Sequence, residues 1–221
     1  MIRLINVSKR YPNGHEALTH ISMELAQGEM AFLTGHSGAG KSTLLKLIAF
    51  IEQANQGQIF VDDQNLNQMS HRQIPYLRRS MGIIFQNSRL LSERTAFDNV
   101  ALPLLISGSY RHSEIKRRVR AALDKVGLLN KEKMYPDSLS QGEQQRLGIA
   151  RAVVNKPRLL LADEPTGNLD PSLSVEIMSL FEQFKQVGVT VLVATHDLAL
   201  IAAFKHPILT LKDGRWLTDK A

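Results

Sequence analysis

A glycine-rich loop, Gly-His-Ser-Gly-Ala-Gly-Lys-Ser, occupies residues 35–42 and separates two segments of different character. The apolar run 30–34 before it is typical of a buried strand, and the stretch 43–49 after it has the periodicity of a helix. Gly35, Gly38 and Gly40 allow the backbone to curl with its N–H groups pointing inward, and the helix that follows adds the positive end of its dipole. This order of elements predicts an α/β fold that binds an anion in the loop.

The loop has the spacing Gly-x-x-x-x-Gly-Lys-Ser/Thr, in which the fixed residues contact phosphate groups. Lys41 can reach the β- and γ-phosphates, and the Ser42 hydroxyl suits Mg²⁺. The alternative interpretation is an ordinary glycine turn before a helix. We expect a nucleoside triphosphate and Mg²⁺ to bind here, with contacts from Gly35, His36, Ser37, Gly38, Ala39, Gly40, Lys41, Ser42 and Thr43.

Composition limits the class of protein. The chain has 221 residues, enough for one large domain or a core domain with a helical insertion. It has no cysteine, which excludes disulfides and thiolate metal sites. No apolar run approaches the roughly 20 residues that cross a bilayer, and the first residues lack the apolar core of a signal peptide. We therefore expect a cytoplasmic protein.

Basic side chains outnumber acidic ones, giving a formal charge of +6, and two segments concentrate them. A solvated helix face is the simplest interpretation, and contact with anionic lipid headgroups is the second. Nucleic acid is not expected as a partner, because neither segment interleaves the aromatic residues that stack on bases. The two clusters are Arg72, Arg78 and Arg79, and Arg111, His112, Lys116, Arg117, Arg118 and Arg120.

Strand-like and helix-like segments alternate along most of the chain. Apolar runs such as 158–163 and 189–194 suit parallel strands covered on both faces, so we expect an α/β sheet wrapped by helices. Before the helix predicted at 171–186, Asp170 suits the cap and Pro171 the first position. Further strands are expected at 2–7, 29–34, 58–61, 81–86 and 207–211, and further helices at 41–49, 114–126, 143–154 and 197–204.

Residues 87–138 interrupt this alternation, because they have mostly helical character and no convincing strand. We interpret them as a helical subdomain inserted into a core that is formed by residues 1–86 and 139–221. The whole chain, 1–221, then forms a single domain.

Two adjacent carboxylates follow the apolar run 159–162. The carboxyl ends of parallel strands form the ligand edge of an α/β sheet, so Asp163 and Glu164 are expected to face the bound phosphates. Asp163 suits coordination of Mg²⁺, and Glu164 suits the general base that polarises an attacking water. The alternative is an ordinary junction between a strand and a loop, but the phosphate loop upstream favours the catalytic interpretation.

Three further side chains are ambiguous when each is taken alone. Gln86 follows a strand-like run, where its amide suits Mg²⁺ or a water molecule. His196 also follows a strand-like run, where it suits contact with the γ-phosphate and the catalytic water. Tyr11 suits stacking on a purine, although a tyrosine near a first strand is also common in a core or on a surface.

The segment 139–143, Leu-Ser-Gln-Gly-Glu, opens a predicted helix. The Ser140 hydroxyl and the N–H of Gly142 form a second anion site at the N-terminus of that helix. Because one phosphate loop already surrounds its phosphates, a second anion site on the same chain indicates the nucleotide of a partner subunit.

Together the motifs form an ordered series that resembles the ATP-binding-cassette ATPases along essentially the whole chain. The resemblance implies a mostly parallel sheet with an N-terminal antiparallel β part, an inserted helical subdomain and Mg²⁺-dependent hydrolysis of ATP. It also implies a head-to-tail dimer that holds two ATP molecules between its subunits, with Ser140, Gly142 and Asp170 acting in trans. Tyr11 would then stack on adenine, and Lys41, Gln86, Asp163, Glu164 and His196 would serve the phosphates, Mg²⁺ and water. The series is Tyr11, residues 35–42, Gln86, residues 139–143, Asp163-Glu164, Gly167-Asn168-Leu169-Asp170 and His196.

Three stretches, 28–48, 123–129 and 148–157, resemble most closely the members of this family that act in cell division of Gram-negative bacteria, and His36 is among the distinctive residues. This resemblance implies two ATPases bound to two copies of an integral membrane protein at the cytoplasmic face of the inner membrane. ATP cycling in such a complex regulates peptidoglycan hydrolysis during septation. The alternatives are the ATPase subunit of an exporter for lipoproteins or small molecules, and an ATP-responsive scaffold with negligible turnover.

The sequence departs from the family pattern at two positions. Gln141 stands where this segment, 139–143, usually has glycine in the family; we expect a tolerated variant, with slowed turnover or weaker ATP-driven dimerisation as the alternatives. Phe50 stands where many members have glycine after the first helix, and we expect it to serve local packing. Within 87–110, some apolar residues are expected to form a groove for a coupling helix of the membrane partner and most to form the subdomain core: Leu90, Leu91, Phe97, Leu102, Leu104, Leu105 and Ile106.

Overall fold

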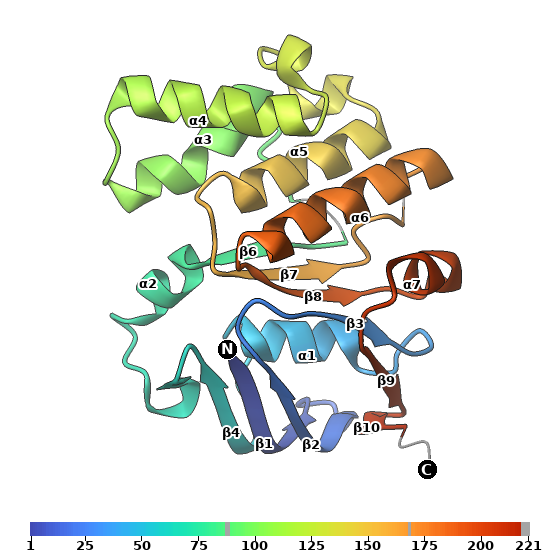
Figure 1. The fold of residues 1–221 in the computed structure, drawn as a ribbon. Helices are drawn as coiled ribbons and strands as arrows, with labels where there is room; N and C mark the ends of the chain where they lie inside the picture. The colour runs from blue at the N-terminus through green and yellow to red at the C-terminus, as the bar shows by residue number, and fades with distance from the viewer. Residues whose placement is uncertain (87–88, 168, 218–221) are drawn as a thin grey trace.

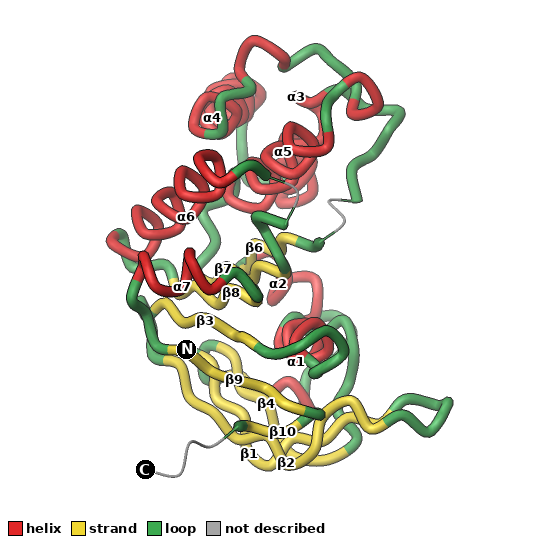
Figure 2. The backbone as a smooth tube through the Cα atoms, turned by 90° about the vertical axis from the view of Figure 1, so that its right-hand side faces the viewer, coloured by secondary structure: helices red, strands yellow, loops and turns green. Residues whose placement is uncertain are grey.

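Two β-sheets lie on either side of a helix in the computed structural model, which describes residues 1–86, 89–167 and 169–217 (Figures 1 and 2). Within these residues, an antiparallel sheet has the strand order β2-β1-β4-β5, and a second sheet has the order β10-β9-β3-β8-β7-β6. In the second sheet, β6, β7, β8, β3 and β9 run parallel, and β10 pairs antiparallel with β9. The strands are β1 (Ile2–Arg10), β2 (Glu16–Leu25), β3 (Met30–Thr34), β4 (Gln56–Val61), β5 (Gln64–Asn65), β6 (Met81–Ile84), β7 (Leu159–Asp163), β8 (Thr190–Ala194), β9 (Ile208–Lys212) and β10 (Arg215–Trp216).

The helices form layers on both faces of the parallel sheet. Figure 1 shows α1 between the two sheets, α5 and α6 over the opposite face of the parallel sheet, and α3 and α4 as an outer layer beyond α5. The helices are α1 (Lys41–Ile48), α2 (Ile74–Arg79), α3 (Ala96–Ser107), α4 (His112–Lys125), α5 (Gln141–Val153), α6 (Pro171–Gln186) and α7 (Leu198–Phe204). None of the described helices is both long and apolar enough to span a membrane.

The central parallel strands β3, β7 and β8 are mostly apolar because each contributes to two hydrophobic cores. In β3, Met30 and Phe32 pack into the core shared with α3, α4, α5 and α6, whereas Ala31 and Leu33 pack into the core that contains α1 and the antiparallel sheet. Successive side chains of a strand point to opposite faces, so a strand between two cores requires apolar residues at every position.

The predicted fold class is confirmed, including the parallel sheet, the antiparallel N-terminal part and the helices between β6 and β7. The sequence interpretation missed β2, α2 and the two-residue strands β5 and β10. β2 was obscured because its pairing with β1 has register shifts, which break the alternation of buried and exposed residues. The division of the chain at residues 86 and 139 stays a prediction, and residues 87 and 88 lie outside the described part.

Phe50 follows α1 with a φ of 52°, in the left-handed region. Glycine adopts this conformation without steric cost, which explains why a glycine suits the position. The Phe50 side chain packs at the edge of the α1 core, and its carbonyl accepts a hydrogen bond from Arg78 Nη2 at 2.7 Å. These contacts agree with the expected role in local packing.

Candidate functional site

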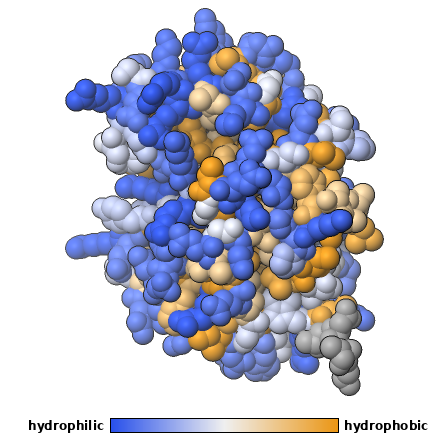
Figure 3. Space-filling view, in the orientation of Figure 1, coloured by the Kyte–Doolittle hydropathy of each residue, from blue (hydrophilic) through white to orange (hydrophobic). Residues whose placement is uncertain are grey.

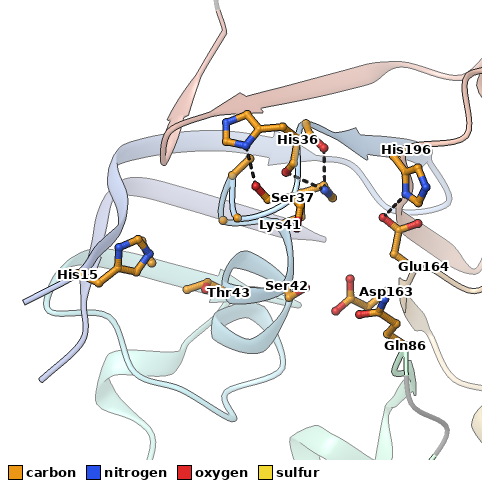
Figure 4. A pocket seen from close by; sticks show the side chains of 15 residues that line it. His15, His36, Ser37, Lys41, Ser42, Thr43, Gln86, Asp163, Glu164 and His196 are labelled. Carbon is orange, nitrogen blue, oxygen red and sulfur yellow. Dashed lines mark hydrogen bonds and ion pairs between the residues drawn. The ribbon is translucent and has the colours of Figure 1, made fainter. Parts of the chain in front are cut away.

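A cavity of about 530 Å³ lies where the carboxyl ends of β3, β6, β7 and β8 meet the loop before α1. Figure 4 shows Ser42, Gln86 and Asp163 close together on one side of this cavity, Glu164 and His196 beside them, and His15 at the far end. The topology of the parallel sheet brings these side chains together from distant parts of the sequence. The lining residues are His15, Ala17, Gly35, His36, Ser37, Gly38, Ala39, Gly40, Lys41, Ser42, Thr43, Gln86, Asp163, Glu164 and His196.

The phosphate loop depends on its glycines for both conformation and space. Gly35, Gly38 and Gly40 have φ values of 148°, 82° and 106°. A Cβ atom at Gly40 would lie 2.6 Å from the carbonyl oxygen of Ala17, and one at Gly35 would collide with the carbonyl of Leu211. Any side chain at Gly35 or Gly40 therefore displaces the loop from β9 or β2 as well as straining its backbone, whereas Gly38 has open space and only its backbone favours glycine.

Lys41 is held inside the loop by the loop itself. Its Nζ atom donates hydrogen bonds to the carbonyl oxygens of Gly35 at 2.7 Å and His36 at 3.2 Å, and the residue is 8% exposed. An ammonium group in this position needs to move little to reach a phosphate that occupies the loop, and its charge is already fixed at the cavity.

The opposite wall offers oxygen ligands for a hard cation. Oδ1 of Asp163 is buried and has no hydrogen-bond partner among the described residues, and Ser42 and Gln86 line the same part of the cavity. Carboxylate, hydroxyl and amide oxygens are the ligands that Mg²⁺ prefers. The residues present therefore fit a Mg²⁺ ion that would share its coordination with phosphate oxygens.

Burial raises the pKa of the Asp163 carboxyl above its ordinary value, and the neighbouring Glu164 charge adds to this effect. A hydrogen bond from Ser42 and the positive charges of Lys41 and Lys46 oppose it. Desolvation therefore exceeds the local stabilisation of the carboxylate, and a cation at this position would favour its ionised form.

Glu164 and His196 form a direct contact across two neighbouring strands. Glu164 follows β7, His196 lies two residues beyond β8, and Glu164 Oε1 is 2.9 Å from His196 Nδ1. The Glu164 side chain is 12% exposed and that of His196 is 74% exposed. Glu164 has a φ of 49°, and its N–H donates to the carbonyl of Ala194 at 2.9 Å. A buried carboxylate is thus held at the cavity beside an exposed imidazole.

The end of the cavity away from Asp163 contains residues that the sequence analysis did not predict. His15 and Ala17 line it, and the ring of Tyr11 stacks on that of His15 with centroids 6.5 Å apart and planes 8° apart. Tyr11 itself does not line the cavity, but Thr43 does, and the Tyr11 hydroxyl lies 3.3 Å from Thr43 Oγ1. No motif in the sequence marks His15, which meets Tyr11 because residues 11–15 form the turn between β1 and β2, closed by a hydrogen bond from the Tyr11 N–H to the carbonyl oxygen of His15 at 2.9 Å.

His36 connects the phosphate loop to the hairpin of β9 and β10. Its Nε2 atom lies 3.1 Å from Asp213 Oδ1, and its Nδ1 atom lies 2.7 Å from the carbonyl oxygen of Ser37. The N–H of Gly214 donates to Ala39 at 3.2 Å, so the loop is fixed to the hairpin at a second point. The histidine thus lies at the rim of the cavity with its ring partly occupied by protein contacts.

Ser140, Gly142 and Asp170 are not brought to the cavity of their own chain. Ser140 caps α5 and is exposed, and Gly142 lies in the first turn of this helix. Asp170 caps α6, as predicted, by accepting hydrogen bonds from the N–H groups of Ser172 and Leu173, both at 3.0 Å. Asn168 lies outside the described residues.

Comparison with known proteins decides the family. The sequence pattern described as ABC transporter matches residues 18–167. The chain belongs to this family. The cell division ATP-binding protein FtsE of Escherichia coli K12 is 58% identical over 97% of this chain and 96% of its own length, and FtsE of Bacillus subtilis 168 is 42% identical over 100% and 96%. The ATP-binding cassette MJ0796, in a dimeric post-hydrolysis state with ADP and Pi, superimposes with a TM-score of 0.94 at 34% identity, over 99% of this chain and 97% of its own.

The chain is thus an ATPase of the ABC family. The phosphate loop, the paired acids at the end of β7 and the histidine after β8 occur in one cavity of the cassette. The signature segment, residues 139–143, lies at the start of α5 and outside this cavity.

Proposed function

We propose that this chain is the ATP-binding and ATP-hydrolysing subunit of an FtsEX-like complex. In this complex, two copies would form a head-to-tail dimer, bind an FtsX-like integral membrane protein and regulate septal peptidoglycan hydrolysis during cell division. The protein would lie at the cytoplasmic face of the bacterial inner membrane as a peripheral subunit. The similarity to FtsE over nearly the full length of both chains supports this assignment.

The contact between Glu164 and His196 is the observation that carries the hydrolytic role. Lys41 would bind the β- and γ-phosphates, and Glu164 would accept a proton from the water that attacks the γ-phosphate. His196 would hold that water and the Glu164 carboxylate in position. Because its ring is mostly exposed, it remains accessible to the γ-phosphate.

Mg²⁺ would be held by Ser42, Gln86 and Asp163 and, when bound, would neutralise charge on the phosphate oxygens. The unpartnered Oδ1 atom of Asp163 supports this set of ligands. Among the described residues, no three His, Cys, Asp or Glu side chains form a metal cluster, so phosphate oxygens would complete the coordination.

Dimerisation would supply the remaining contacts to ATP. Ser140 and Gly142 lie outside the cavity of their own chain, at an exposed helix N-terminus that suits an anion. In the dimer they would contact the γ-phosphate bound to the partner subunit, and Asp170 would lie at the same interface. The dimeric state of the MJ0796 cassette supports this arrangement.

A groove of about 450 Å³ between α2, α3, α5 and β6 suits the membrane partner. Leu102 and Ile106 of the predicted coupling segment line it, whereas Leu104 is fully buried in the core. Apolar walls with an arginine rim fit an amphipathic segment that carries acidic residues. The groove is lined by Pro75, Arg78, Arg79, Met81, Ile83, Phe85, Leu102, Pro103, Ile106, Arg151, Ala152 and Asn155.

Basic residues just before α2 and at the start of α4 would contact the membrane surface. Arg72 lies just before α2, and Arg111, Lys116 and Arg117 lie at the start of α4, all exposed. Figure 3 shows hydrophilic side chains projecting along the edge where Figure 1 has α2 and the connection from α3 to α4. Anionic headgroups around the docked partner would attract these charges.

ATP turnover of the purified chain, alone and with an FtsX-like partner in lipid nanodiscs, tests the proposal. We expect stimulation by the partner and loss of turnover in Glu164→Gln, which should trap ATP in a dimer. Lys41→Ala should weaken nucleotide binding. Stimulation by an exporter's membrane subunit instead would favour the transporter alternative. ATP binding without turnover in either setting would favour the scaffold.

No contact of Gln141 favours the scaffold alternative. Gln141 is the first residue of α5, is exposed and lies outside the left-handed region, so its backbone does not require glycine. A tolerated substitution remains the interpretation that the geometry supports.

A further inference from the structure

Ser140, the signature serine, is held by a chain of contacts that begins outside the signature segment. Its N–H donates to Glu143 Oε2 at 3.0 Å, and its Oγ atom accepts from the N–H of Glu143 at 3.3 Å. This reciprocal capping box fixes the side-chain direction of Ser140. Because Oγ is occupied as an acceptor within the cap, its hydroxyl hydrogen is left to donate to an outside anion.

The other oxygen of Glu143 is bound by Lys131. Lys131 Nζ donates to Glu143 Oε1 at 2.5 Å, and the two side chains are only 32% and 18% exposed. Both carboxylate oxygens are therefore fixed, one by the cap and one by the lysine. A partly buried, charge-assisted hydrogen bond of this kind restricts the carboxylate more than a solvent-exposed pair does.

Lys131 lies on a segment that is fixed to the helical layer. It is the last residue of a short 3-10 turn (Leu129–Lys131). The first two residues of α3 form backbone hydrogen bonds to the segment that directly follows this turn. The N–H of Ala96 donates to Met134 at 2.7 Å, and that of Phe97 donates to Glu132 at 2.8 Å. The lysine therefore connects the position of the α3–α4 layer to the first turn of α5.

Charge gives the lysine a second effect. A carboxylate in the first turn of α5 stabilises the helix through a favourable interaction with the helix dipole. The same negative charge would repel a polyphosphate that approaches Ser140. A cation paired with this carboxylate offsets the repulsion. A lysine near a helix N-terminus is unfavourable for the helix itself, so helix stability alone does not account for Lys131.

We propose that Lys131 is a positioning residue, which acts through Glu143 to aim Ser140 at the ATP of the neighbouring subunit. The inference rests on the proposed head-to-tail dimer. It adds a residue outside the signature segment to the machinery that recognises ATP in trans, and it couples that recognition to the helical layer.

The experiment compares Lys131→Met, Lys131→Arg and Lys133→Met in the Glu164→Gln background. Lys133 is an exposed neighbour with no ion pair among the described residues, so it is the matched control for loss of one positive charge. Three quantities are measured: the dissociation constant of the ATP-dependent dimer by sedimentation, monomer affinity for a fluorescent ADP, and amide hydrogen exchange across residues 138–146.

Lys131→Met should weaken the dimer by about tenfold, as expected for loss of one charge-assisted hydrogen bond. Exchange in the first turn of α5 should accelerate, whereas ADP affinity should stay unchanged because Lys131 is remote from the cavity of its own chain. Lys131→Arg should restore both dimerisation and protection, and Lys133→Met should resemble the parent.

An unchanged dimer and unchanged exchange in Lys131→Met would overturn the inference, as would an equal loss of ADP affinity, which indicates general destabilisation. If the parent itself fails to dimerise with ATP, the proposed dimer is wrong. The exchange data then decide whether Lys131 holds the cap.

Discussion

The left-handed backbone of Glu164 predicts that a glycine at this position is more stable than an alanine, which is the reverse of the usual order. A non-glycine residue in this region costs about 1–2 kcal/mol, because its Cβ approaches the backbone, and Glu164 has a φ of 49°. Glu164→Ala retains the Cβ atom, whereas Glu164→Gly removes it. Both variants lose the same hydrogen bond to His196, so their difference isolates the backbone.

Glycine loses more conformational entropy on folding than alanine does, and this cost of about 0.5–1 kcal/mol offsets part of the strain energy that glycine removes. We therefore expect Glu164→Gly to exceed Glu164→Ala in free energy of unfolding by about 0.5–1 kcal/mol. For a chain of this size, that difference corresponds to about 1–4 °C in Tm. Both variants should lose turnover by about 100-fold or more, since the proposed general base is absent.

Urea unfolding of the nucleotide-free variants at neutral pH is the assay. Gln183, exposed in the interior of α6, provides the control, because alanine there should be more stable than glycine by about 1 kcal/mol. If alanine is as stable as glycine at position 164 while Gln183 behaves as expected, then no backbone strain is stored at the hydrolysis site.

Three further predictions follow from individual contacts. Asp163→Asn should reduce Mg²⁺-dependent turnover by about 100-fold or more. The same variant should leave the nucleotide-free protein at least as stable at pH 7, because a neutral amide avoids the desolvation that raises the pKa of the buried carboxyl; normal turnover at low Mg²⁺ would contradict the assigned ligand. The hydrogen bond from Lys131 lowers the pKa of Glu143 below 4.5, so its contribution to stability is complete above that pH and is lost as the pH falls through the lowered value. Glu143→Gln should therefore be less stable than the natural protein by about 1 kcal/mol at pH 7, with the difference disappearing in acid, as followed by thermal unfolding across pH. Phe50→Ala should destabilise the fold by about 1–2 kcal/mol and Phe50→Gly by less, because glycine relieves the left-handed backbone; the reverse order in urea unfolding would refute this.

Much of the site could be predicted because its chemistry is contained in short contiguous segments. The phosphate loop needs glycines, a lysine and a serine within eight positions, and its conformation is a property of that local backbone. Asp163 could be placed from the apolar strand before it, since parallel strands end at one edge of a sheet. The cap of α6 by Asp170 was predictable for the same local reason.

Other features of the site depend on which segments become neighbours. Glu164 and His196, 32 positions apart, meet because β7 and β8 are adjacent in the sheet, and His36 meets Asp213 across 177 positions through β9. His15 reaches the cavity from the turn just before the irregular β2, a strand that no alternation in the sequence revealed.

The sequence by itself therefore determined the nucleotide chemistry of this protein and its fold class, and it predicted the end of the sheet at which ATP is proposed to bind. Only the tertiary structure decided the partner of each proposed catalytic side chain, the left-handed backbone of Glu164 and the contact from Lys131 to Glu143. The physical reason is that turn, cap and periodicity preferences act over a few residues, whereas strand order and helix packing fix contacts between segments that are far apart in the chain.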